Sequence, residues 1–144
     1  MRTRRGRSRN NFLRFSAFIP RATSIRRTVL KAVPKVPFER IAREVLGPRY
    51  DLSLVLCGDA LARRLNAQYR KKNYCSNVLS FPLAPTEGEI FLNTRAAARE
   101  ARKFRVPLRA RLTLLFIHGC LHLRGLRHGK EMEDRESKVL SQFT

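Results

Sequence analysis

The sequence predicts an α+β domain, in which a small mixed β-sheet packs against helices and a central buried helix carries metal-ligating histidines. Three observations lead to this prediction. Short alternating apolar segments of strand type lie between longer segments with helical periodicity. Residues 112–123, LTLLFIHGCLHL, are apolar on nearly every face, which indicates a helix in the middle of the domain. The only three histidines of the chain lie between His118 and His128.

The size and composition favour one domain with its own core, because 43% of the 144 residues are hydrophobic. We expect residues 24–144 to form this domain and residues 1–23 to be a disordered basic extension. The chain has no apolar run of about eighteen residues, and arginines interrupt each apolar stretch before residue 40, so no membrane span or secretory signal is predicted. Three widely spaced cysteines imply no disulfide framework, so we expect a cytoplasmic protein.

The charge of the chain points to a polyanionic partner. The formal net charge is +20, and residues 39–144 alone carry +9, because the eleven acidic residues all lie there. Basic surfaces bind nucleic acid through counterion release, and we favour this interpretation over a merely soluble arginine-rich surface. For residues 1–23 we favour an RNA-binding arm. A mitochondrial transit peptide, which would change the expected location, and an extension without function are the alternatives.

The first half of the chain alternates between predicted strands and helices. Residues 24–33 are apolar enough for a strand, and Pro37 suits the start of a short helix through FERIAREVL. Residues 50–57 alternate leucines on one face and predict a second strand. Asp59 is the expected N-cap of a helix over 60–70, where leucine and tyrosine form an apolar stripe at helical spacing.

Two further strands and a capped helix are predicted in the middle of the chain. Residues 77–83 form a strand that Pro82 ends or places at the edge of the sheet, because proline cannot donate to a strand ladder. Residues 84–88 follow as a loop, and residues 89–93 form the next strand. Thr94 is the expected cap of the alanine-rich helix after it.

The last part of the chain is predicted to be two helices. Pro107 opens a long helix that runs to about Leu123, and Gly125 stops it. The final helix covers roughly residues 130–143. Its first turn is acidic, which the helix dipole favours; the acidic residues are Glu131, Glu133 and Asp134.

The three histidines have the spacing of a metal site. His118 and His122 are at i and i+4, so both imidazoles lie on one side of the helix and can reach one ion at about 2.0–2.1 Å. After Gly125 breaks the helix, His128 can return as a third ligand. Three neutral nitrogens with an open fourth position describe a catalytic zinc site, in which the pKa of bound water falls to about 7. Separate core or surface histidines are the alternative, and we expect Cys120 to be a buried non-ligand.

The same histidine spacing occurs in metzincin proteases. Those enzymes need a glutamate directly after the first histidine as general base. That position is Gly119 here, so a metalloprotease is only a distant alternative.

Several motifs resemble those of the YbeY family, bacterial and organellar endoribonucleases of ribosomal RNA maturation. The segment HGCLHLRGLRH is similar to the family pattern H-G-x-L-H-L-x-G-x-D-H. LNAQYRKKNYCSNVLSFPL is similar to L-N-x-x-Y-R-x-K-x-x-x-T-[DN]-V-L-S-F-P, and GEIFLN to the G-[DE]-I strand of the family. YDLSLVLCGD matches the strand and turn that precede these motifs. The resemblance runs from about residue 36 to 143.

The resemblance implies a site as well as a fold. It assigns one zinc ion to the three histidines and a catalytic role to Arg70, with His118 taking part in catalysis as a ligand. A guanidinium near the metal can hold a scissile phosphate and stabilise its developing charge. Asn77 and Ser80 are weaker candidates for substrate contacts, since a capping asparagine and an ordinary strand serine explain them equally well.

Two departures from the family pattern affect these assignments. Arg127 replaces the aspartate before the third histidine and reverses its charge, so no role is carried over from that position. Ser76 replaces threonine and keeps a hydroxyl. No general base is identifiable, because the acidic residues after His128 are explained more simply by the start of a helix.

The function implied is a single-strand-specific, zinc-dependent endoribonuclease in 16S rRNA 3′-end processing and ribosome quality control. Its expected partners are single-stranded rRNA and the small ribosomal subunit, with neither membrane nor DNA. The alternative from another class is a non-catalytic ribosome-assembly factor with a structural zinc site. Structural sites usually have four protein ligands and this chain offers three, which favours catalysis.

Overall fold

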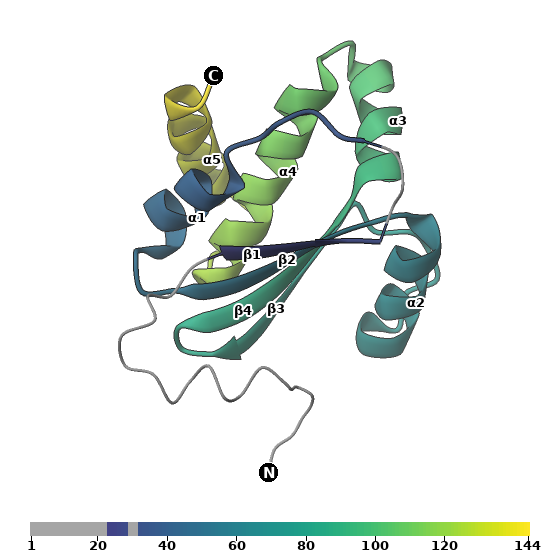
Figure 1. Cartoon of the computed structure of the whole chain (residues 1–144), viewed down its shortest axis with the longest axis horizontal. Coiled ribbons are helices and arrows are strands. Elements are labelled where there is room, and N and C mark those ends of the chain that lie inside the picture. Colours follow the sequence, from purple (N-terminus) through teal and green to yellow (C-terminus); the bar gives the residue numbers. More distant parts are fainter. Residues whose placement is uncertain (1–22, 29–31) are drawn as a thin grey trace.

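The computed structural model describes residues 23–28 and 32–144. The predicted basic extension therefore lies almost entirely outside the described residues. The helices and strands follow one another along the chain as the sequence predicts (Figure 1). In order they are β1 (Thr23–Arg27), α1 (Phe38–Leu46), β2 (Asp51–Cys57), α2 (Asp59–Arg70), β3 (Val78–Ala84), β4 (Glu87–Asn93), α3 (Thr94–Phe104), α4 (Leu108–Leu123) and α5 (Lys130–Gln142).

The strands form one mixed sheet in the order β1-β2-β4-β3. β1, β2 and β4 are parallel, and β3 pairs with β4 in the antiparallel sense. β3 is therefore an edge strand, which explains how it accommodates Pro82 near an irregularity in the register. The predicted α+β fold with a small mixed sheet is confirmed.

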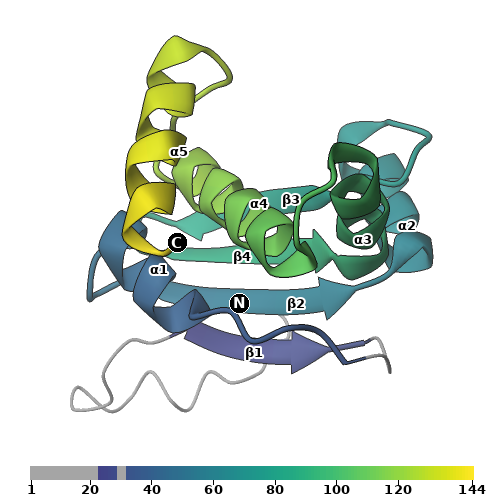
Figure 2. The ribbon, with the colours of Figure 1, turned by 90° about the horizontal axis from the view of Figure 1, so that it is seen from above.

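Helix α4 crosses one face of the sheet and contacts α1, α3 and α5 (Figure 2). Its side chains Leu112, Phe116 and Ile117 are fully buried, as a helix that is apolar on nearly every face requires. Leu52, Leu54 and Leu56 of β2 point to this face and belong to the same core. The predicted central buried helix is confirmed.

Helix α2 packs against the opposite face of the sheet. Val55 and Cys57 of β2 point there, because neighbouring strand residues alternate between faces. They form a second small core with Ala62 of α2. The two ends of α2 thus lie on the other side of the sheet from the body of α4.

Several predicted boundaries are wrong. β1 ends at Arg27, well before residue 33. The predicted loop over 84–88 is shorter, because β3 and β4 both extend into it and a tight turn joins them. Asp59 is the first residue of α2, and Gly58 occupies the capping position. The Asp59 carboxylate accepts two hydrogen bonds from Arg99 of α3, at 2.8 and 2.9 Å. It therefore binds this arginine and does not cap α2.

The predicted cap of α3 is also off by one residue. Asn93 caps this helix, since its Oδ1 accepts hydrogen bonds from the backbone N–H groups of Arg95 and Ala96, both at 3.1 Å. The Thr94 hydroxyl instead donates to the Cys57 carbonyl at 3.3 Å and ties α3 to the end of β2.

Two further features of the described residues concern helix length and the cysteines. Among the helices in residues 23–28 and 32–144, none is both long and apolar enough to cross a membrane. All three cysteines are free thiols, and Cys57 and Cys120 are buried.

Candidate metal centre

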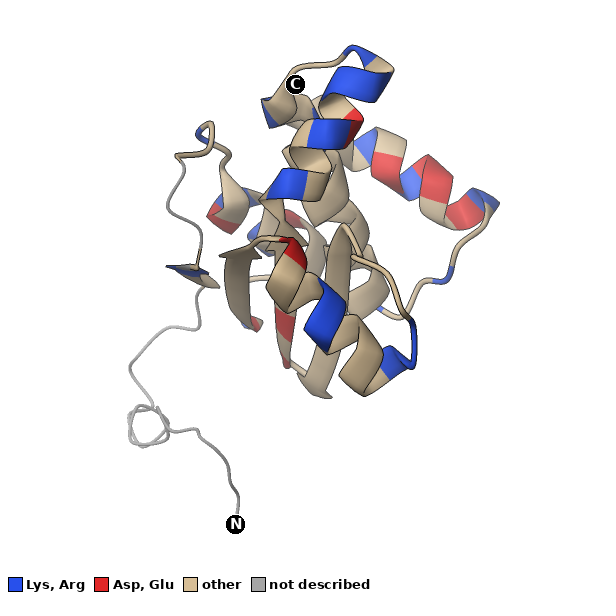
Figure 3. Cartoon of the chain, turned by 90° about the vertical axis from the view of Figure 1, so that its right-hand side faces the viewer, with Lys and Arg blue, Asp and Glu red and all other residues tan. Residues whose placement is uncertain are grey.

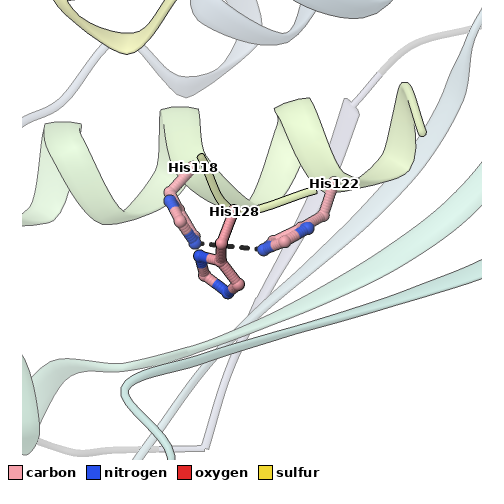
Figure 4. Close-up of side chains that lie close together, drawn as sticks. All are labelled: His118, His122 and His128. Atoms are coloured by element: carbon pink, nitrogen blue, oxygen red, sulfur yellow. Dashed lines mark hydrogen bonds between the residues drawn. The ribbon is translucent and has the colours of Figure 1, made fainter. Parts of the chain in front are cut away.

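The three histidines converge on one point (Figure 4). His118 and His122 project from α4 one turn apart, and His128 comes from the segment between α4 and α5. Their rings are 4.6–4.9 Å apart between centroids. One ligand nitrogen from each ring lies within 4.8 Å of the others, so the three together can hold a single metal ion.

Hydrogen bonds orient the rings of His118 and His122 through Nδ1, which leaves Nε2 of each ring facing the cluster. His122 Nδ1 donates to the Leu126 carbonyl at 3.0 Å, since a carbonyl can only accept. His118 Nδ1 contacts the Glu136 carboxylate, which accepts its proton in the same way. Both imidazoles are then left with an unprotonated Nε2.

The two Nε2 atoms lie 3.0 Å apart and face each other. Two lone pairs cannot form a hydrogen bond with each other, and a cation shared between them would satisfy both. Two nitrogens bound to one tetrahedral zinc at about 2.0–2.1 Å are about 3.3 Å apart, close to the observed separation. The spacing of this pair therefore fits a zinc ion.

The surroundings keep His122 neutral. Burial lowers the pKa of its imidazole, and the neighbouring His118, His128 and Arg70 lower it further, against the hydrogen bond to Leu126. A lowered pKa favours the unprotonated imidazole that binds a metal.

Arg70, the predicted catalytic arginine, lies near these histidines. It is the last residue of α2, and its charge acts on the pKa of His122. Its side chain is exposed, and among the described residues no hydrogen bond or ion pair holds it. Helix α2 contacts β3 and β4, which brings its C-terminal end toward the strand under α4. Arg70 therefore offers an unengaged guanidinium whose charge acts on the histidine cluster.

The two weaker candidates have structural partners. Ser80 of β3 donates to the Gly119 carbonyl of α4 at 2.8 Å, and Asn77 donates to Glu100 at 3.1 Å. A Cβ on Gly119 would lie 3.1 Å from the Ser80 hydroxyl, so helix and strand are in close contact there. These bonds explain both side chains as parts of the fold, and their role in substrate binding stays a prediction.

Glu136 is the site residue that sequence reasoning missed. It lies on α5, eighteen residues after His118, and only 17% of its side chain is exposed. It follows the buried Met132 by one helical turn, on the face of α5 that continues with Val139 and Leu140. An acidic residue within such an apolar stripe was the available signal. It could not identify the partner, because that depends on how α5 packs on α4.

The acidic residues that follow His128 lie at the start of α5, where the helix dipole favours them. Asp134 pairs with Lys130 at 3.4 Å, and Glu131 lies 3.8 Å from Arg135. Glu131, Glu133 and Asp134 are all exposed. Arg127 is exposed as well, and Glu136 supplies the carboxylate of this site from another element.

Cys120 is buried away from the histidines, as expected for a non-ligand. It lies on α4 within the hydrophobic core, with no exposed surface. Burial raises the pKa of its thiol far above the ordinary value, which keeps it protonated.

The fold and the histidine cluster together define an α+β protein with a three-histidine metal centre on its central helix. The family model for Endoribonuclease YbeY matches residues 21–144, and the chain belongs to this family. Among curated relatives, Endoribonuclease YbeY of Gluconobacter oxydans is 43% identical over 95 residues, 61% of this chain and 56% of that protein. Endoribonuclease YbeY of Helicobacter pylori is 38% identical over 112 residues, 73% of this chain and 79% of that protein.

The length covered differs among the relatives. The chain spans 56% and 64% of the relatives from Gluconobacter oxydans and Aromatoleum aromaticum, the second of which is 39% identical. The fold is similar to the solution structure of TM1509 from Thermotoga maritima, with a TM-score of 0.61 and 24% identity over 84% of this chain and 88% of that one. The predicted family and fold are confirmed.

Proposed function

We propose that this protein is a zinc-dependent endoribonuclease that cuts single-stranded ribosomal RNA. One observation carries the proposal: two histidine Nε2 atoms face each other at 3.0 Å with both Nδ1 atoms engaged, and the charge of the free Arg70 guanidinium acts on this pair. This pairs a cation site with a phosphate-binding group. The membership in a family named for endoribonuclease activity supports RNA as the substrate.

Each residue of the site has a distinct task. His118, His122 and His128 would hold one zinc ion, which when bound supplies Lewis-acid polarisation and activates water near neutral pH. Glu136 fixes the ring of His118 so that its Nε2 points into the cluster. Arg70 binds the scissile phosphate and stabilises the negative charge that develops on its oxygens.

Three protein ligands favour catalysis over a purely structural metal, because closed structural sites usually have four. The residue after the first histidine is Gly119, which packs against β3 and carries no acid, so the site lacks the general base of a metzincin protease.

The biological setting that we propose is maturation of the 3′ end of 16S rRNA and ribosome quality control, in the cytoplasm. The small ribosomal subunit would present the single-stranded segment. The net charge of +20 supports this proposal, because neutralising RNA phosphates releases counterions.

Cleavage of a labelled single-stranded RNA with the sequence of the 16S rRNA 3′ end tests the activity. Zinc-loaded wild type should cut it, and folded His118→Ala and Arg70→Ala variants should not. Arg135→Ala, which removes an exposed arginine of α5, should cut like wild type and is the matched control. Cleavage that persists in folded His118→Ala would refute the proposed site. A lowered melting temperature without any cleavage by wild type would favour the non-catalytic assembly factor.

A further inference from the structure

Two of the most exposed aromatic side chains lie five residues apart, at the two ends of the six-residue segment YRKKNY. Tyr69 is 60% exposed and Tyr74 is 54% exposed. The Tyr69 ring packs edge-on against Phe81 with centroids 5.4 Å apart, and Phe81 packs in the same way against Phe91 at 5.9 Å. One part of the Tyr69 ring is thus anchored on the sheet while most of its surface faces solvent.

The backbone of the segment is fixed by a buried asparagine. Asn66 of α2 is 1% exposed, and its side-chain amide donates to the Tyr74 carbonyl at 3.0 Å. The Asn66 carbonyl accepts from the backbone N–H of Lys72 at 3.1 Å, and Lys71 ends the helix in the left-handed region with φ of 58°. The backbone that carries both tyrosines is therefore positioned before any ligand binds, and the Tyr69 ring is held by Phe81, which reduces the entropy lost on binding.

The segment is strongly basic. Residues 60–86 contain no acidic residue and five basic ones. Arg70, Lys71 and Lys72 are exposed, and within the described part of the chain no ion pair engages them. Figure 3 shows the face on which α2 and the segment after it lie, with basic residues along both. A partner with many negative charges fits this surface, and single-stranded RNA also offers flat bases to the two exposed rings.

The segment includes Arg70, the residue to which the proposed function assigns the scissile phosphate. Tyr69 directly precedes it in the chain. A strand whose phosphate binds Arg70 would therefore have its neighbouring nucleotides at Tyr69 and Tyr74.

We propose that residues 69–74, here called the YRKKNY segment, bind single-stranded RNA next to the cleavage site by stacking nucleobases on Tyr69 and Tyr74. Lys71 and Lys72 neutralise the adjoining phosphates. Aromatic rings among basic residues bind single strands in this way because each base has a π-face, whereas the bases of a duplex are already stacked. This inference rests on the proposed function and adds to it a structural reason for single-strand preference.

Affinity for an oligonucleotide, measured apart from cleavage, tests the proposal. The zinc-loaded full chain is titrated into fluorescein-labelled 2′-O-methyl oligouridylate of about ten nucleotides, shown intact by electrophoresis afterwards. Tyr69→Ala should weaken binding about 5- to 100-fold, and Tyr69→Phe should bind like wild type, since the ring and not the hydroxyl stacks. Tyr69→Leu keeps apolar packing against Phe81, and it should lose affinity like the alanine variant.

Two controls separate stacking from charge. Phe104→Ala removes a 50% exposed ring beside Lys103 on another helix, and it should leave affinity unchanged. Tyr69→Ala should keep the salt dependence of wild type, while Lys71→Ala and Lys72→Ala should each make it shallower. An oligonucleotide with abasic residues keeps its phosphates, and it should bind wild type and Tyr69→Ala equally.

The outcomes distinguish this inference from the proposed function. Wild type that binds oligouridylate while folded Tyr69→Ala binds equally well would overturn the stacking surface alone. Wild type that binds no single-stranded RNA would overturn both.

Discussion

Glu136 offers the sharpest test of how the metal centre is built, because its carboxylate contacts a histidine and not the ion. It accepts the Nδ1 proton of His118, and both side chains are largely shielded, with 17% and 22% exposed. Replacing Glu136 by alanine leaves that imidazole free to rotate or to change tautomer. Loss of such an orienting partner typically weakens metal affinity about 10- to 100-fold, or about 1.4–2.7 kcal/mol.

The assay is zinc affinity by competition with a chromophoric chelator at neutral pH. We expect Glu136→Ala to lose about 10- to 100-fold in affinity and Glu136→Gln to lose less, because glutamine keeps a neutral acceptor but not the charge. Glu133→Gln changes an exposed acid on the same helix and should bind zinc like wild type. Zinc affinity of Glu136→Ala equal to that of wild type would refute the orienting role.

Three further predictions follow from the same structure. Zinc at a free concentration of 100 times its Kd should raise the free energy of unfolding of wild type by about 2.7 kcal/mol and so raise its melting temperature. In His118→Ala this rise should vanish. An undiminished rise would show that the ion binds elsewhere. Hydrogen bonds from Arg99 and Asn93 lower the pKa of the Asp59 carboxyl to about 2. The ionised carboxylate therefore stabilises the fold fully above its ordinary pKa near 3.8, and this stabilisation is lost as pH falls through about 2. Acid unfolding of Asp59→Asn should therefore depend less on pH between about 4 and 2, and an unchanged profile would contradict this. Gly119→Ala should destabilise the protein by about 1–3 kcal/mol in urea unfolding, despite alanine's helix propensity, because its Cβ meets the hydrogen-bonded Ser80 hydroxyl at 3.1 Å. An increase in stability would show that β3 moves aside.

Part of this site could be predicted from local sequence alone. The i, i+4 spacing of His118 and His122 places both rings on one side of α4 whatever surrounds the helix. The apolar character of residues 112–123 required burial, and Pro82 required an edge strand. Gly125, at φ of 93°, ends α4 in a conformation that favours glycine, so the chain can turn back with His128.

The contacts between elements were decided by the tertiary structure. Asp59 has the residue type and position of a cap, yet Arg99 from α3 holds its carboxylate, because a bidentate charged partner is stronger than a capping bond. Glu136 meets His118 only because α5 packs on α4. Periodicity and capping preferences act over a few neighbouring residues. The sequence by itself therefore determined the order of helices and strands, and it determined that two of the metal ligands, His118 and His122, share one face of α4. Which side chains from different elements meet depends on packing of the whole core, and only the folded chain brings Glu136 to His118 and lets the charge of Arg70 act on His122.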